Sequence, residues 1–241
     1  MRRRADALLV ERGLADSRER ARALILAGKV HSGEQRVEKA GQLLASAAQL
    51  SVAQPPPYVS RGGLKLEHAL SEFRLDVSGV TALDIGASTG GFTDCLLQRG
   101  AKRVFALDVG YGQIDLRLRS DPRVTVIERV NARYPFTLAE MAQLATVDVS
   151  FISVEKLLPA VSAALREHAP VAVLLKPQFE AGRREVRKGG IVRDPQVHAR
   201  VLGRFIAWAV GHGFRLRGLV PSPILGAEGN REFFVLLEKA S

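Results

Sequence analysis

Short β-rich runs alternate with helical stretches over most of the chain, and this alternation limits the possible folds more than any other feature. It is typical of βαβ units, which build a parallel sheet covered by helices on both faces. The β-rich runs are Val80–Ile85, Val104–Asp108, Val124–Glu128, Val147–Val149 and Val171–Lys176. The helical stretches between them are Phe92–Arg99, Leu138–Leu144 and Val154–Glu167.

The end of the chain departs from this alternation. Pro195–His212 reads as a helix, and Leu216–Val220 and Glu232–Leu237 follow as two strands with no helix between them. We expect these strands to form a hairpin that adds an antiparallel last strand to the sheet. The predicted fold class is therefore α/β, with a mostly parallel, Rossmann-like, seven-stranded sheet.

The distribution of aromatic residues indicates a second, smaller domain. Residues 1–57 contain no Phe, Trp or Tyr, and Pro55-Pro56-Pro57 reads as a stiff linker. We therefore divide the chain into residues 1–57 and 58–241. The first part reads as a small α+β domain, in which one helix stops at Gly13 and a second, capped by Ser17, ends at Gly28. A hairpin-like turn at Ser32-Gly33-Glu34 follows.

The chain is strongly basic, with a formal net charge of +10 and a pI near 10.3, which favours a polyanionic partner such as nucleic acid. The single cysteine, Cys95, excludes an internal disulfide, and the five histidines lack zinc-ligand spacing, so we expect no metal. No signal peptide and no membrane span are read. We expect a soluble, cytoplasmic protein that does not associate with membranes.

A glycine-rich turn follows the first predicted strand of the sheet and reads Gly86-Ala87-Ser88-Thr89-Gly90-Gly91-Phe92. Such a turn lets a ligand approach the backbone closely, as in dinucleotide-binding and S-adenosylmethionine-binding loops. Ser88 replaces the second glycine of the dinucleotide fingerprint, and Asp84 can face the cationic end of S-adenosylmethionine, so the second class is favoured. Asp108 can accept hydrogen bonds from ribose hydroxyls in either class. Asn131 either contacts the adenine or faces water.

Four further residues lie where the layout predicts a ligand crevice. Asp148 and Lys176 each end a predicted strand, and the carboxyl ends of parallel strands form such a crevice. Lys65 lies just before the first strand of the sheet, and Glu232 opens the last one. These four residues form either a catalytic cluster or a surface ion-pair cluster.

These residues and the glycine-rich loop resemble the Lys-Asp-Lys-Glu tetrad of FtsJ-like ribose 2′-O-methyltransferases. The N-terminal segment, with Arg4-Ala5-Asp6, Ala15-Asp16-Ser17-Arg18 and Gly28-Lys29-Val30, resembles an S4 RNA-binding domain. Together they resemble the TlyA (hemolysin A) family of ribosomal RNA methyltransferases. Two departures are His31-Ser32 where S4 domains usually carry an Asn before the turn glycine, and Thr89 where FtsJ-like loops often have Pro.

The resemblance implies S-adenosylmethionine as cofactor and a ribosomal RNA or subunit as substrate. It favours a cytidine of 23S rRNA over the alternative, 16S rRNA, because this chain is similar to the shorter members. The reaction needs a base for the ribose 2′-hydroxyl, and we expect neutral Lys176 in that role, favoured by partial burial and by Lys65. Asp148 would orient Lys176, and Glu232 would position Lys65 and the ribose. Lys65, Asp148, Lys176 and Glu232 are thus the expected catalytic residues, and the glycine-rich loop with Asp84, Asp108 and Asn131 the expected cofactor site.

Basic residues in two regions, together with Arg61, are the predicted RNA contacts. Arg18 and Arg22 share a helix face in the first domain, where a solvated charged helix is the alternative interpretation. The loop at 180–194 is the second region and is expected to order on RNA. The full set is Arg4, Arg18, Arg22, Lys29, Arg61, Arg183, Arg184, Arg187 and Lys188.

Other functions explain less of the sequence. A catalytically inactive S4-type ribosome-binding factor is the main alternative, but the loop and all four tetrad positions are present. A membrane-lytic protein would need a long apolar or strongly amphipathic segment. A nucleotide-dependent dehydrogenase would leave the tetrad unexplained, and Ser88 breaks its fingerprint.

Overall fold

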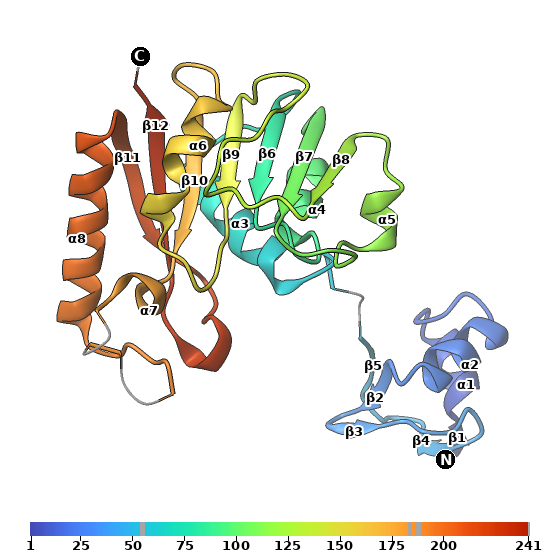
Figure 1. Ribbon diagram of the computed structural model, residues 1–241. Helices are drawn as coiled ribbons and strands as arrows, with labels where there is room; N and C mark the ends of the chain where they lie inside the picture. Colours follow the sequence, from blue (N-terminus) through green and yellow to red (C-terminus); the bar gives the residue numbers. More distant parts are fainter. Residues whose placement is uncertain (54–55, 183–184, 187–188, 241) are drawn as a thin grey trace. The chain divides into compact units, whose positions relative to one another are not determined.

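A computed structural model describes residues 1–53, 56–182, 185–186 and 189–240 (Figure 1). The chain divides into two compact units, Met1–Pro56 and Pro57–Ser241, and each is described by itself. Pro55, part of the predicted stiff linker, lies outside the described residues.

The first unit packs two short helices on small antiparallel sheets. Helix α1 (Ala5–Glu11) and helix α2 (Arg18–Leu26) contribute Leu9 and Ile25 to its core. The predicted cap of the second helix is confirmed, because the Ser17 side chain accepts a hydrogen bond of 3.1 Å from the amide of Arg20. The strands are β1 (Arg2–Arg4) paired with β4 (Leu43–Ala45), and a sheet of β3 (Gln35–Arg36), β2 (Val30–Ser32) and β5 (Leu50–Val52).

The second unit is built on a seven-stranded sheet in the order β11-β12-β10-β9-β6-β7-β8. Strand β12 runs antiparallel to both of its neighbours, β10 and β11, while the other neighbouring strands pair in parallel, as predicted. The strands are β6 (Thr81–Ile85), β7 (Arg103–Asp108), β8 (Val124–Glu128), β9 (Leu144–Val147), β10 (Pro170–Leu175), β11 (Phe214–Pro221) and β12 (Phe233–Lys239).

Helices cover both faces of this sheet (Figure 1). Alternate residues of a strand point to opposite faces, so Ala82 of β6 packs with α3 and α4, while Leu83 packs with α6 and α8. The helical elements are α3 (Arg61–Glu72), α4 (Gly91–Gln98), α5 (Leu116–Arg119), η1 (Val154–Lys156), α6 (Leu158–Ala163), α7 (Pro177–Glu180), α8 (Pro195–Gly211) and η2 (Ala227–Gly229).

Two predicted helical stretches differ from the structure. Leu138–Leu144 is not helical, and its last residue, the buried Leu144, instead begins strand β9 and pairs beside Ala82. The stretch from Val154 is broken into η1 and the short α6, since Pro159 is tolerated only in the first turn of a helix.

Candidate active site

The glycine-rich turn joins β6 to α4 through backbone conformations that favour glycine. Gly86 and Gly90 have φ values of +80° and +95°. A Cβ on Gly86 would also collide with the carbonyl oxygen of Asp148, so the turn and the end of β9 approach as closely as only glycine allows. Ser88 adopts a left-handed conformation as well, with φ +49°, which is uncommon for a residue with a side chain.

Asp108, at the end of β7, holds this turn in place. Its Oδ2 accepts a hydrogen bond of 2.8 Å from the Ser88 amide, and its Oδ1 accepts one of 2.7 Å from the Gly110 amide. The Ser88 hydroxyl also donates a 3.3 Å hydrogen bond to Gln113 Oε1. Each carboxylate oxygen has two lone pairs, so Asp108 can still accept hydrogen bonds from a ligand.

The Asp84 side chain points in a different direction from the one that the sequence predicts. Its side chain is fully buried and accepts hydrogen bonds from the hydroxyls of Thr93, at 2.7 Å, and Thr146, at 2.9 Å. Side chains alternate across a strand, and this one points toward α4, so the carboxylate lies behind the turn rather than toward a bound ligand. Burial raises the pKa of Asp84 to about 6, although both hydroxyls oppose the shift.

A cavity of about 500 Å³ lies at the carboxyl ends of β6, β7 and β9. Four of the predicted cofactor-binding residues line it, namely Gly86, Ser88, Asp108 and Asn131. Asn131 Oδ1 accepts a 3.0 Å hydrogen bond from the Arg133 amide, which fixes its side chain beside the cavity. The remaining walls are largely apolar and include Leu107, Val109, Val130, Val149 and Ile152. This volume and lining suit a small-molecule ligand.

A second cavity of about 230 Å³ adjoins the first, since Gly86, Ser88 and Asp148 line both. Lys65 and Arg61 of α3 form its basic wall. The predicted loop residues Gly91 and Phe92 also line this second cavity rather than the first. Gly90 lines neither of the two cavities. Its φ of +95° lets the chain turn into helix α4.

The four predicted catalytic residues form two lysine–carboxylate pairs, and one member of each pair, Lys65 and Asp148, lines the second cavity. Lys176 Nζ lies 2.7 Å from Asp148 Oδ1, and Lys65 Nζ lies 2.5 Å from Glu232 Oε2. Lys65 and Glu232 are separated by most of the second unit in sequence, and both are buried. Because each pair joins different elements, the pairs depend on the folded sheet and are not local surface contacts.

Lys176 is held on two sides at the end of β10. In addition to the ion pair, its Nζ donates a 2.9 Å hydrogen bond to Ser150 Oγ. Asp148 Oδ1 is buried and accepts no hydrogen bond from the described residues, so its contact with Lys176 is electrostatic. Lys176 itself lines neither cavity, whereas its partner Asp148 lines both. When neutral, an amine held in this way can accept a proton from a hydroxyl group, and a carboxylate beside it stabilises the resulting cation.

Sequence reasoning missed several residues of the site. Thr93, Thr146 and Ser150 are partners of ionisable groups, and a single hydroxyl in a sequence gives no sign of its partner. Phe151 is the clearest omission, because it lies only three residues after Asp148 and no role is predicted for it from the sequence. It is 91% exposed, has φ +65° and packs against the Phe179 ring at 4.9 Å between centroids.

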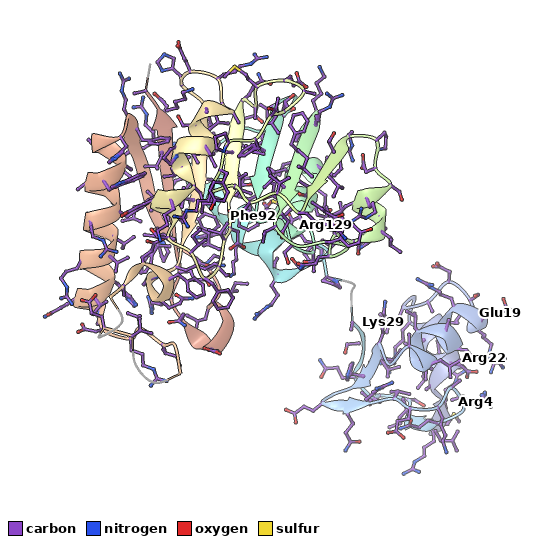
Figure 2. All side chains as sticks on the ribbon, viewed as in Figure 1. Arg4, Glu19, Arg22, Lys29, Phe92 and Arg129 are labelled. Atoms are coloured by element: carbon purple, nitrogen blue, oxygen red, sulfur yellow. The ribbon has the colours of Figure 1, made fainter. Side chains whose placement is uncertain are left out.

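The predicted RNA-binding residues occupy three settings. In the first unit, Arg4, Arg18 and Arg22 all lie around the buried Asp6, and Arg4 and Arg22 are labelled in Figure 2. Lys29 is partly buried beside the end of α2, and Arg61 is exposed at the start of α3. The other four predicted residues, Arg183, Arg184, Arg187 and Lys188, lie outside the described residues.

Two kinds of feature are absent from the described residues. No group of three or more His, Cys, Asp or Glu side chains there is arranged to hold a metal ion. No helix in that part of the chain is long and apolar enough to cross a membrane.

Comparisons with known proteins agree with this architecture. Residues 58–239 match the FtsJ-like methyltransferase family, and residues 3–49 match the S4 domain. A Bacillus subtilis protein described as an rRNA methyltransferase, YqxC, is 52% identical over 97% of this chain and 85% of its own length. The 16S/23S rRNA (cytidine-2′-O)-methyltransferase TlyA of Mycobacterium tuberculosis is 44% identical over 98% of this chain and 90% of its own length.

A solved structure also covers the whole chain. It is described as a hemolysin from Streptococcus thermophilus, with 44% identity, a TM-score of 0.76, and coverage of 100% of this chain and 89% of that chain. An identity of this size over nearly the full length of both chains establishes common family membership. The chain belongs to the TlyA (hemolysin A) family, and it is a methyltransferase that joins an S4 domain to an FtsJ-like catalytic domain.

Proposed function

We propose that this enzyme transfers a methyl group from S-adenosylmethionine to a ribose 2′-hydroxyl of ribosomal RNA. The observation that carries the proposal is the Lys176–Asp148 pair, because Asp148 lines both adjoining cavities and Lys176 Nζ lies 2.7 Å from it. One cavity then holds the methyl donor and the other admits the ribose. The name of the M. tuberculosis relative, which specifies cytidine-2′-O methylation of 16S and 23S rRNA, supports this substrate class.

The first cavity fits S-adenosylmethionine in its chemistry. Asp108 retains acceptor capacity for the ribose hydroxyls of the cofactor, and Asn131 lies on the same wall for the adenine. Apolar side chains such as Leu107 and Ile152 suit the adenine ring, and Gly86 allows close approach to the backbone. When bound, S-adenosylmethionine supplies an electrophilic methyl group on a positively charged sulfur.

Lys176 acts as the general base in this proposal. The 2′-hydroxyl of the target ribose would give its proton to neutral Lys176 Nζ as its oxygen takes the methyl group; the methyl–sulfur bond would break with its electron pair left on sulfur as a neutral thioether, and the amine would end as a cation beside Asp148. Asp148 and Ser150 hold Nζ in position before the transfer. Lys65, fixed by Glu232, lies on the wall of the second cavity and positions the ribose. Alignment of the reacting atoms supplies a large part of the rate.

Two surfaces position the RNA. Basic residues of the S4 domain bind phosphates, which fixes the register of the substrate without reading its bases. Phe151 stands exposed at the mouth of the first cavity on top of Phe179, where a nucleobase can stack on its ring. A cytidine of 23S rRNA in the cytoplasmic large ribosomal subunit is the favoured target, because the chain resembles the shorter members of the family.

The direct test is tritiated methyl transfer from S-adenosylmethionine to separated small and large ribosomal subunits. Lys176→Ala is the test variant, and Lys102→Ala, which removes an exposed lysine next to β7, is the matched control. Calorimetric titration with S-adenosylmethionine runs alongside for each protein. We expect label in the RNA of the large subunit with wild type and control, and none with Lys176→Ala, which still binds the cofactor.

Different failures have different meanings. Label that persists with Lys176→Ala contradicts the assignment of the base. Label confined to the small subunit contradicts the 23S preference. If wild type neither transfers label nor binds S-adenosylmethionine, an inactive ribosome-binding factor becomes the better account.

A further inference from the structure

A buried aspartate lies beneath three arginines in the first unit. Asp6, in the first turn of α1, has a fully buried side chain. Arg4 of β1 donates to both of its oxygens, from Nε to Oδ1 at 3.1 Å and from Nη2 to Oδ2 at 3.0 Å. Arg18 Nη2 lies 3.4 Å from Oδ1, and Arg22 Nε lies 3.5 Å from Oδ2. Two separate elements, β1 and α2, thus direct guanidinium groups to one carboxylate.

The charges of this cluster do not balance. Three guanidinium groups surround one carboxylate, which leaves a net charge of +2. The arginine side chains remain 47%, 55% and 55% exposed, whereas the aspartate is out of solvent. The arginines hold the pKa of Asp6 well below its usual range, so the carboxylate stays ionised at every physiological pH.

The cluster is larger than stability alone requires. One bidentate arginine would satisfy a buried carboxylate, and Arg4 already provides that contact. Without an anion between them, three arginines would repel one another and spread into solvent. Each guanidinium has five N–H donors, and no hydrogen bond to another described residue occupies the groups turned away from Asp6, so they can bind a second anion on the solvent side.

We propose that Asp6 is a positioning residue that holds Arg4, Arg18 and Arg22 together as a preformed site for one backbone phosphate of RNA. The proposal rests on the proposed function, since it assumes that the S4 domain binds ribosomal RNA. Guanidinium groups fixed in advance lose less side-chain entropy on binding, and they form charge-assisted hydrogen bonds with phosphate oxygens.

Removal of the Asp6 charge distinguishes positioning of the arginines from attraction of RNA by net positive charge alone. If only net charge matters, Asp6→Asn makes the surface more positive and tightens RNA binding. If Asp6 positions the arginines, the same change weakens binding. The matched control is Glu11→Gln, because Glu11 forms an exposed pair of 2.8 Å with Arg3 and holds no cluster.

The experiment measures the affinity of the full chain for in-vitro-transcribed 23S rRNA by filter binding. We expect Asp6→Asn to bind about tenfold more weakly, the size of one lost charge-assisted hydrogen bond, and Asp6→Glu to recover part of the loss. We expect Glu11→Gln to bind within about twofold of wild type. Amide hydrogen exchange of α1 and α2 checks that the unit remains folded.

A double-mutant cycle separates positioning from a purely structural role. In a background that carries Arg18→Gln and Arg22→Gln, Asp6→Asn should add a smaller loss than in wild type, because two of the three arginines that it positions are absent. An equal loss in both backgrounds overturns the proposal, as does tighter binding by Asp6→Asn alone. If wild type itself does not bind 23S rRNA while Asp6→Asn stays folded, the proposed function fails, and this inference fails with it.

Discussion

Replacement of Asp84 by asparagine should stabilise the methyltransferase domain at alkaline pH. Asp84 is completely buried, and its partners Thr93 and Thr146 are neutral hydroxyls, so no cation compensates its charge. Asparagine has nearly the same shape and can hydrogen-bond to the same hydroxyls without a buried charge. The change therefore removes the free-energy cost of burying the carboxylate charge, which the folded state bears whenever Asp84 is ionised.

The size of the effect follows from the pKa. Asp84 shifts from the ordinary value of 3.8 to about 6 in the folded protein. The folded state then binds the proton more tightly than the unfolded state, so stability is lost as pH rises from 3.8 through 6. At about 1.4 kcal/mol per pKa unit, the cost reaches about 3 kcal/mol at pH 8 and about half of that at pH 5.

Denaturant unfolding monitored by Trp208 measures this directly, because Trp208 is the only tryptophan and lies in α8 of the second unit. We expect Asp84→Asn to raise the free energy of unfolding at pH 8 by up to about 3 kcal/mol, with a smaller gain at pH 5. The control is Asp121→Asn. Arg123 lowers the pKa of Asp121, so the charge of Asp121 favours the folded state, and its removal should not raise the free energy of unfolding. A less stable Asp84→Asn variant, or a difference that does not change with pH, would show that a buried charge on Asp84 does not destabilise the folded domain.

Three further predictions concern other parts of the chain. A Cβ on Gly226 would collide with the Glu232 carboxylate, so Gly226→Ala should lower kcat at least about tenfold. A Cβ on Gly203 meets no neighbouring atom, so Gly203→Ala is the control and should leave kcat unchanged. Equal kcat values for the two variants would argue against a role for Glu232. Phe151→Ala should lower kcat/KM for RNA about tenfold through lost stacking, and an unchanged value would exclude the ring as a contact. Ser17→Ala should destabilise α2 by about 1 kcal/mol, seen as faster amide exchange in its first turn; unchanged exchange would contradict the capping role.

The sequence predicts those features that depend on local pattern. Alternating strands and helices identify the parallel sheet, and the lack of a helix between the last two strands identifies the antiparallel hairpin. The carboxyl ends of parallel strands share one edge, so the positions of Asp148 and Lys176 at two such ends are enough to predict that they meet.

Features that depend on tertiary partners are beyond such reasoning. The sequence around Asp84 does not show that its side chain points toward α4 rather than toward the cleft. A position on β6 shows only that neighbouring side chains point to opposite faces of the sheet, not which face each one takes. Leu144 follows Met141 at a spacing of three residues, which a helix would allow, yet it begins strand β9 of the central sheet. The sequence gives no sign of the role of Asp6, because the arginines that surround it come from two different elements.

Lys176→Arg tests whether Lys176 accepts the proton of the ribose hydroxyl. Arginine keeps the positive charge beside Asp148 but is not deprotonated in proteins. Single-turnover methyl transfer to large ribosomal subunits, at saturating S-adenosylmethionine, separates the two roles. We expect cofactor affinity within about twofold of wild type and a rate at least about 100-fold lower. A rate close to wild type would contradict proton acceptance by Lys176 and would leave it with an electrostatic role alone.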